Sequence, residues 1–114
     1  MRLIGSKGED IAVKFLKGKG YRILSRNFKT PIGEIDIIAE DRDTLVFVEV
    51  KTRTSNSFGQ PFEAVGSRKR EKLRKVALSY LKRSGKLMPS RFDVLSIEVH
   101  EGNSKIEHII DAFE

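Results

Sequence analysis

The stretch from Gly33 to Lys51 constrains the fold of this chain more than any other. Residues Glu34 to Ala39 alternate between acidic and aliphatic side chains, and residues Leu45 to Val50 are rich in β-branched and aromatic side chains, as β-strands are. Asp41 to Thr44 supplies turn formers between them. The pattern predicts a β-hairpin with a two- or four-residue loop, in which the numbers of paired residues sum to 85.

This register gathers ionisable side chains on one face of the hairpin. It places Asp36 opposite Glu49 and Glu34 opposite Lys51. Because strand side chains alternate between the two faces, all four then share one face. The opposite face takes the aliphatic positions, which are Ile35, Ile37, Val46, Val48 and Val50.

Such a patch favours a bound cation. Two carboxylates about 4 Å apart repel by roughly 4 kcal/mol at an effective dielectric near 20, and a divalent cation between them reverses the sign of this energy. Mg²⁺, or Mn²⁺ in its place, prefers hard oxygen ligands, so Asp36 and Glu49 are the predicted metal ligands. Lys51 would lie beside the metal, where it could act on water or offset charge on a phosphate. This is the chemistry of phosphodiester hydrolysis.

The same residues resemble a known nuclease motif. Asp36 followed by Glu49-Val50-Lys51 looks like the PD-(D/E)xK motif of restriction-endonuclease-like proteins, although Ile35 stands where that motif has proline. The wider sequence resembles the YraN-like family of small bacterial endonuclease-like proteins. That likeness runs from about Gly8 to Val99, through GEDIAVKFLKGKGYRIL, RNF, GEIDIIA, VFVEVKTR and the FG-P-EAV segment. In outline the chain is also similar to archaeal Holliday-junction resolvases, which implies a metal-dependent nuclease acting on DNA, including branched DNA.

Periodicity predicts the other elements. Helices are expected over Ser6 to about Lys17 and over Ser67 to about Arg83. Three further strands are expected over Tyr21 to Phe28, Arg91 to Val99 and Lys105 to Ile110. Serines are the predicted N-caps of both helices, and glycines are expected to end them. The order predicts an α/β fold with a mixed sheet flanked by helices, whose fourth strand runs parallel to its neighbour. Its αβββαβ core with an extra C-terminal strand matches the restriction-endonuclease-like fold that the resemblance implies, although element order alone allows other α+β arrangements.

The first predicted helix carries a carboxylate on its apolar side. Glu9 shares a face with Ala12 and Leu16. Two interpretations of Glu9 stay open: it caps its own helix through capping-box spacing with Ser6, or it reaches the strand patch as a supporting acid. The second interpretation follows from the likeness to resolvases. Gly8, on the same face, would allow a close approach of the backbone to another element.

The second predicted helix is strongly basic. Residues 66–86 hold nine Lys or Arg and one acid, a net charge of +8, so the rest of the chain sums to −2. This concentration indicates a polyanion partner, and a solvated helix face is the alternative. The apolar stripe of the helix indicates core packing. Arg68, Lys72 and Lys75 point away from that stripe, whereas Lys69 projects toward the end of the sheet, and all four are candidate nucleic-acid contacts.

The polar segment from Thr52 to Pro61 leaves the strand beside the predicted site. Arg53 is a candidate phosphate contact, and Phe58 is either a stacking residue or part of an ordinary connection. Gln60 resembles a polar residue that follows the Glu-x-Lys strand in some of these nucleases, so the resemblance implies a nucleic-acid contact for it.

Composition excludes several other classes. A chain of 114 residues is expected to form one domain, residues 1–114. Without cysteine it has neither disulfides nor thiolate zinc sites. No apolar run approaches the roughly 18 residues of a membrane span, and the N-terminus is too short for a signal-peptide core, so a cytoplasmic protein without membrane contact is expected. His100 and His108 lack metal-pair spacing, and Asp93 is interpreted as a hydrogen-bonded strand-end residue or an extra acid.

Three functional hypotheses follow. The first is a Mg²⁺-dependent nuclease with Asp36, Glu49 and Lys51 at its centre and Glu34 and Glu9 as supporting acids. The second is a non-catalytic nucleic-acid-binding module with a vestigial nuclease site, and the third is a purely structural ion-pair cluster in which Glu34 pairs with Lys51 across the strands. A resolvase-like role would require two sites related by symmetry, which favours a homodimer.

Overall fold

The computed structural model describes residues 4–54 and 65–113. In chain order its elements are α1 (Ile4–Gly18), β1 (Arg22–Lys29), β2 (Glu34–Asp41), β3 (Thr44–Thr54), α2 (Ser67–Ser84), β4 (Ser90–His100) and β5 (Asn103–Phe113). The strands form one sheet in the order β1-β2-β3-β4-β5, with β3 and β4 parallel and the other neighbours antiparallel. The αβββαβ core with an extra C-terminal strand is therefore confirmed, as is the parallel fourth strand.

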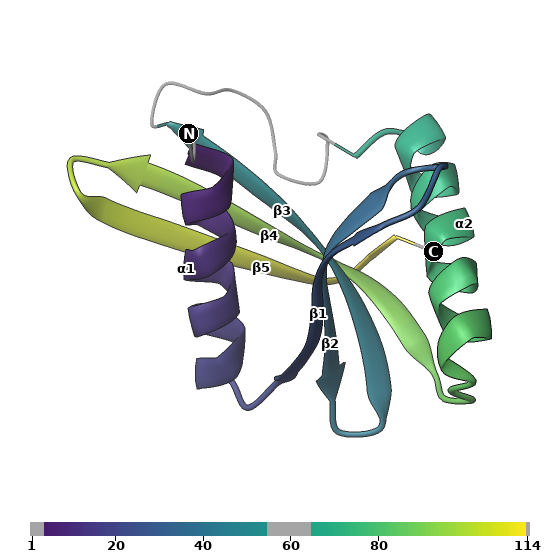
Figure 1. The fold of residues 1–114 in the computed structure, drawn as a ribbon. Coiled ribbons are helices and arrows are strands. Elements are labelled where there is room, and N and C mark those ends of the chain that lie inside the picture. Colours follow the sequence, from purple (N-terminus) through teal and green to yellow (C-terminus); the bar gives the residue numbers. More distant parts are fainter. Residues whose placement is uncertain (1–3, 55–64, 114) are drawn as a thin grey trace.

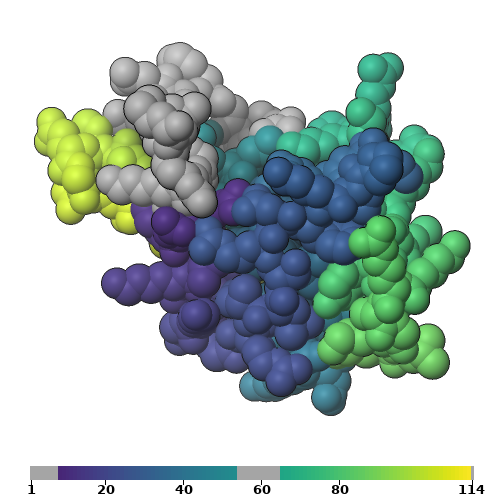
Figure 2. Space-filling view, viewed as in Figure 1, coloured from purple at the N-terminus to yellow at the C-terminus, as the bar shows by residue number. Residues whose placement is uncertain are grey.

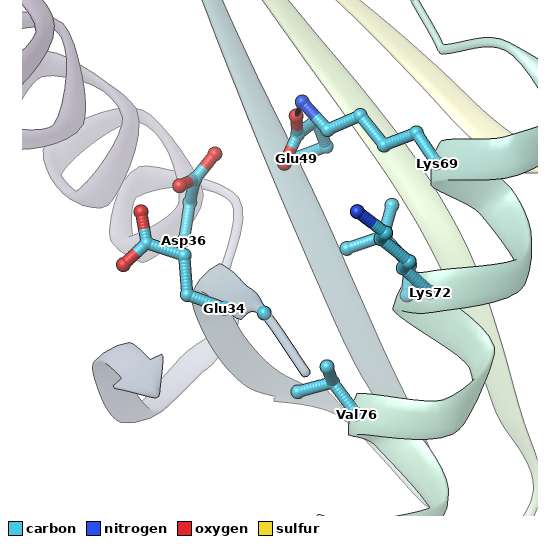
Figure 3. Close-up of a pocket in the computed structure, with 8 residues that line it drawn as sticks. Glu34, Asp36, Glu49, Lys69, Lys72 and Val76 are labelled. Atoms are coloured by element: carbon cyan, nitrogen blue, oxygen red, sulfur yellow. Dashed lines mark ion pairs between the residues drawn. The ribbon is translucent and has the colours of Figure 1, made fainter. Parts of the chain in front are cut away.

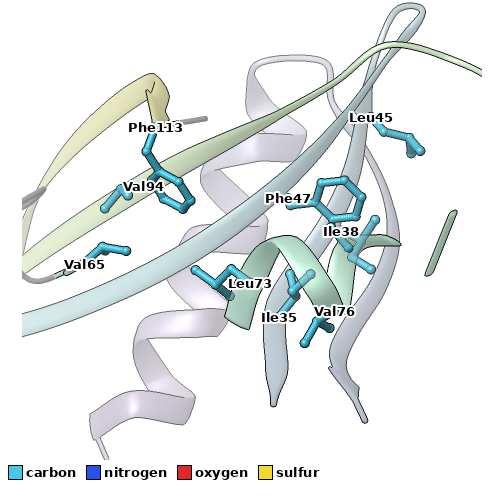
Figure 4. Close-up of a cluster of buried hydrophobic side chains, with 10 residues drawn as sticks. Ile35, Ile38, Leu45, Phe47, Val65, Leu73, Val76, Val94 and Phe113 are labelled. Carbon is cyan, nitrogen blue, oxygen red and sulfur yellow. The ribbon is translucent and has the colours of Figure 1, made fainter. Parts of the chain in front are cut away.

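The two helices lie on opposite sides of the twisted sheet (Figure 1). On the α1 side the buried cluster includes Ala12, Leu16, Ile37, Val48 and Leu95. On the α2 side, Figure 4 shows a second cluster, formed by Ile35, Ile38, Leu45, Phe47, Val65, Leu73, Val76, Val94 and Phe113. Each fully buried aliphatic or aromatic side chain contributes about 1.5–3 kcal/mol. In the space-filling view, β1 and β2 cover the middle of the face shown, and the turn between β4 and β5 protrudes at the left (Figure 2).

Both helices end at glycine, as predicted, but neither has the predicted serine as its N-cap, although α2 does begin at Ser67. Gly20 has a φ of 91°, and Tyr21 N–H donates to the Leu16 carbonyl at 3.0 Å, which forms a Schellman motif. Ser6 lies inside α1, which already includes Ile4. The N-cap of α2 is Gly66, whose extended backbone places its carbonyl to accept the Arg70 N–H at 2.9 Å. The two serine caps were wrong: Ser6 lies inside α1, and Ser67 is the first residue of α2 rather than its N-cap.

Close packing joins α1 to β3. A Cβ at Gly8 would overlap Thr52 Oγ1 and lie 3.2 Å from Thr52 Cβ. The helix therefore approaches the strand more closely than any residue with a side chain would allow. This contact lies one residue along the chain from both Glu9 and Lys51, so it fixes α1 next to the predicted site.

The hairpin has the predicted register up to the predicted site. Partners in β2 and β3 run from Asp41↔Thr44 to Ile37↔Val48, and every pair sums to 85. The expected alternation fails one residue further: Ile35 was predicted on the same face as Ile37, yet it packs on the α2 side. The neighbouring strand β1 is also irregular here, because its residue Asn27 has a φ of 53°. β2 stops pairing with β3 at Ile37 but continues to pair with β1, and Asn27 lies between the β1 partners of Ile37 and Ile35.

A buried polar cluster that links β4 to β5 accounts for Asp93. Its carboxylate accepts hydrogen bonds from Arg91 Nε at 3.0 Å and from the Asp111 N–H at 2.9 Å, and His108 Nε2 lies 2.7 Å away. Burial alone would raise the pKa of Asp93, but these hydrogen bonds outweigh it and lower the pKa. Asp93 and His108 thus join β4 to β5, in agreement with the interpretation of Asp93 as a hydrogen-bonded residue.

Candidate active site

The candidate site lies where β2 and β3 separate. Beyond the pair Ile37↔Val48 the ladder between the strands ends, and Asp36 Oδ2 instead accepts the Val50 N–H at 2.8 Å. A side chain of β2 therefore takes the place of a backbone partner for β3. This contact holds the Asp36 carboxyl group beside β3, next to Glu49.

A pocket of about 160 Å³ opens at this separation. Its residues come from β2, β3, α2 and the turn before β2, namely Gly33, Glu34, Asp36, Glu49, Lys69, Lys72, Leu73 and Val76. Figure 3 shows the carboxylates of the strands on one side and the lysines of α2 on the other. The pocket thus has an acidic wall and a basic wall, which suits a ligand that combines a cation with a phosphate group.

Glu49 is the most enclosed charged residue of the pocket. It is only 6% exposed, and its Oε2 atom forms ion pairs with Lys51 Nζ at 3.4 Å and with Lys69 Nζ. Two ammonium groups therefore share one carboxylate oxygen. Positive charge is stabilised at this point of the structure.

Asp36 has a strongly perturbed acidity. Burial, followed by the negative charge of Glu49, raises the pKa of Asp36 from 3.8 to about 7, although the Val50 N–H opposes the shift. Interaction with the nearby Glu49 carboxyl group through hydrogen bonding also acts to raise the pKa of Asp36. Near neutral pH Asp36 therefore holds a proton for part of the time, and a cation that replaces this proton would gain oxygen ligands from Asp36 and Glu49.

The two lysines that contact Glu49 differ in acidity. Burial and the nearby Lys69 ammonium group lower the pKa of Lys51, even though Glu49 opposes the shift. Burial also acts to lower the pKa of Lys69, but the contact with Glu49 outweighs it and raises the pKa. Lys51 is thus the lysine that gives up a proton more readily, and Lys69 is the one that keeps its charge.

The other two predicted acids lie at the margin of the site. Glu34 is exposed at the pocket rim and pairs in the sheet with Lys29. Among the described residues the predicted ion pair between Glu34 and Lys51 is absent: β2 and β3 no longer pair at Glu34, and Lys51 contacts Glu49. Glu9 reaches in from α1 and forms an ion pair with Arg26 at 3.7 Å, while its charge contributes to the raised pKa of Asp36.

The predicted nucleic-acid contacts fall into two groups. Lys69 and Lys72 line the pocket. Lys72 was expected to point away from the apolar stripe of α2, but it lines the pocket together with Leu73 and Val76 of that stripe. Arg68 and Lys75 lie exposed on α2, where Lys75 pairs with Glu71 at 3.7 Å. The remaining predictions concern Arg53, Gln60 and Phe58. Of these, Arg53 is half-buried on β3, while Gln60 and Phe58 lie outside the described residues.

The donor atoms of the pocket suit a hard divalent cation. Asp36 and Glu49 offer carboxylate oxygens beside a cavity with room for water, and the ammonium groups on Glu49 show that the position favours positive charge. Within residues 4–54 and 65–113, no three His, Asp or Glu side chains come together as a metal cage. Mg²⁺ in proteins is commonly coordinated in this way, by one or two carboxylates with water and phosphate oxygens as its other ligands.

Comparisons with a family model and with individual relatives point to the same family. The family model described as uncharacterised protein family UPF0102 matches residues 8–97. A UPF0102 protein of Syntrophomonas wolfei is 52% identical over 113 residues, covering 98% of each chain. A UPF0102 protein of Thermodesulfovibrio yellowstonii is 48% identical over 110 residues, covering 96% of this chain and 95% of its own.

Among solved structures, Pyrococcus furiosus SfsA in complex with Ca²⁺ aligns with 91% of this chain at 16% identity and a TM-score of 0.36. This chain spans 60% of the length of that one. In the described part of the chain, neither helix has the length and apolar character needed to cross a membrane.

Proposed function

This chain belongs to the uncharacterised protein family UPF0102, and we propose that it is a metal-dependent nuclease that hydrolyses phosphodiester bonds in DNA. One observation carries the proposal. Asp36 and Glu49 share a pocket with Lys69 and Lys72, and Lys51 contacts Glu49 from the same strand. Paired carboxylates beside several lysines are the groups that metal-assisted phosphate hydrolysis requires.

Each side chain has a role that follows from its position. Asp36 and Glu49 would hold Mg²⁺ or Mn²⁺, which when bound supplies a Lewis acid for water and phosphate. Lys51, whose pKa is lowered, accepts a proton from the attacking water or donates one to the leaving oxygen more readily than an ordinary lysine. Lys69 and Lys72 place positive charge where the phosphate oxygens become more negative.

The surface around the pocket supports nucleic acid as the substrate. Arg68 and Lys75 lie exposed on the same helix as Lys69 and Lys72, so basic charge continues from the pocket onto the surface of α2. A polyanion that runs along α2 would place one of its phosphates at the pocket. If the substrate is a four-way junction, the proposal extends to a homodimer, because two strands must then be cut at sites related by symmetry.

The test is cleavage of labelled linear duplex, single-stranded and four-way-junction DNA with Mg²⁺, with Mn²⁺ and with a chelator. We expect metal-dependent cleavage by the native protein and its loss in Asp36→Asn and in Lys51→Ala. Lys82→Ala is the matched control, because it removes a lysine from the far end of α2. Metal-dependent cleavage that persists in Asp36→Asn would rule out this site.

A second candidate function is non-catalytic binding of nucleic acid. It is favoured by one observation: Lys51 and Lys69 both form ion pairs with Glu49, so residues of this chain balance its charge. This function predicts DNA binding that weakens steeply with added salt and no cleavage of any of the three substrates. If a calorimetric titration also shows no uptake of Mg²⁺, the carboxylates have only a structural role.

A further inference from the structure

Lys69 makes an unusual contact for a lysine in the first turn of a surface helix. Its ammonium group lies on Glu49 Oε2, across the pocket from its own helix (Figure 3). Lys51 contacts the same oxygen at 3.4 Å. Glu49 is therefore neutralised from two sides, by its own strand and by α2.

The two contacts differ in how easily they can be given up. Lys51 stands two residues after Glu49 on a central strand, and its side chain is 29% exposed. The Lys69 side chain is 42% exposed and ends a flexible four-carbon stem. Its ammonium group can leave Glu49 by rotation of the side chain alone, without movement of the sheet or helix.

The pocket offers Lys69 a second partner. Lys72, almost one turn further along α2, lines the same cavity, and Glu34, Asp36 and Glu49 form the wall opposite. A phosphate group in this cavity would meet both lysines, provided that the charge of Glu49 is neutralised by something else. A divalent cation on Asp36 and Glu49 would do this.

We propose that Lys69 exchanges partners: it neutralises Glu49 until a divalent cation binds there, and it then contacts a phosphate group of the bound DNA. This inference rests on the proposed function. It identifies Lys69 and Lys72 as a phosphate-binding pair. It also makes Lys69 the link between metal binding and DNA binding.

The exchange has a thermodynamic consequence. Without DNA, Lys69 competes with the cation for Glu49 and so weakens cation binding. With DNA present, the phosphate holds Lys69 away from Glu49, so each ligand strengthens the binding of the other. Replacing Lys69 by glutamine removes the competitor and the link together. The variant should bind the cation more tightly and respond less to DNA.

The experiment is a calorimetric titration of the full chain with Mg²⁺ alone, in the native protein, Lys69→Gln and Lys72→Gln. We expect Lys69→Gln to bind Mg²⁺ at least about fivefold more tightly than the native protein. Fivefold is the lower end of the change in affinity that coupled binding sites typically show. Lys72→Gln is the matched control, since it removes the same charge from the same pocket. Equal gains in both variants would indicate a general field effect and overturn the exchange, as would no gain in Lys69→Gln.

A second measurement tests the link to DNA. In a Lys51→Ala background, where we expect no cleavage, the affinity for a labelled DNA duplex is measured by fluorescence anisotropy with and without Mg²⁺. Mg²⁺ should tighten DNA binding in this background and have little effect once Lys69→Gln is added. An unchanged response to Mg²⁺ would overturn the exchange.

The two proposals fail in different ways. If the native protein neither binds Mg²⁺ nor cleaves DNA, the proposed function is wrong, and the exchange is wrong with it. If the native protein binds Mg²⁺ and cleaves DNA, but Lys69→Gln leaves Mg²⁺ affinity unchanged, only the exchange is wrong.

Discussion

Asp36→Asn should stabilise the folded protein at neutral and alkaline pH when no metal is present. The folded state raises the pKa of Asp36 from 3.8 to about 7, chiefly through burial and the charge of Glu49. Below pH 4 the carboxyl group is protonated in both the folded and the unfolded chain. Between about pH 4 and pH 7 the unfolded chain loses this proton and the folded chain keeps it, so the free energy of unfolding falls as pH rises. Above pH 7 it levels off.

The structure sets the size of this effect. One pH unit inside the window removes about 1.4 kcal/mol, so the loss over the whole window reaches at most about 4 kcal/mol. Asparagine has no proton to lose. Its amide oxygen can still accept the Val50 N–H, and its amide group is able to donate a hydrogen bond toward the nearby Glu49 carboxylate. The variant should therefore match the native protein near pH 4 and exceed it by about 1–4 kcal/mol at pH 8.

The assay is urea denaturation in a chelator at several pH values from 4 to 8, followed by circular dichroism. Asp93→Asn is the comparison, because hydrogen bonds lower the pKa of Asp93 in spite of its burial. Its carboxylate stabilises the fold above the unfolded-state pKa, and this contribution is lost only as pH falls through the lower folded-state pKa. Asp93→Asn should therefore destabilise the protein at pH 8. If Asp36→Asn is less stable than the native protein at pH 8, or shows the same pH slope, the account of Asp36 is wrong.

Two further predictions concern packing and DNA contact. Gly8→Ala should lower the free energy of unfolding by about 1–3 kcal/mol in urea denaturation, because its Cβ would overlap Thr52 Oγ1. Gly18→Ala, where a Cβ meets no atom within 4 Å, should cost far less, and an equal cost for both would contradict the packing argument. Lys72→Gln should reduce the slope of log affinity against log salt for DNA by about 1, since it removes one phosphate contact. An unchanged slope would place Lys72 outside the DNA interface.

Local sequence patterns were sufficient for the hairpin and for most of the fold. The two-residue turn at Arg42 and Asp43 fixes the register, so the turn residues alone predict the pairing as far as Ile37↔Val48. Apolar periodicity located α2 and its buried stripe, which includes Leu73 and Val76. These features depend on residues close together in the chain, and short-range geometry determines them.

The same patterns failed at the point where β2 stops pairing with β3. Regular alternation predicted Ile35 on the same face as Ile37, but the β2–β3 ladder ends at Ile37 and Ile35 packs on the α2 side. The serine caps were also wrong, since α1 already includes Ile4 and the N-cap of α2 is Gly66, one residue before Ser67.

The sequence by itself determined the order of elements, the register of the hairpin and the presence of two carboxylates and a lysine near its open end. Only the tertiary structure decided that β2 and β3 separate at Asp36 and that Lys69 and Lys72 form the opposite wall of the pocket. The physical reason is the burial of Leu73 and Val76 against Ile35. That packing joins segments more than 30 residues apart and positions the lysines of α2 over Glu49, and no local pattern encodes such a contact.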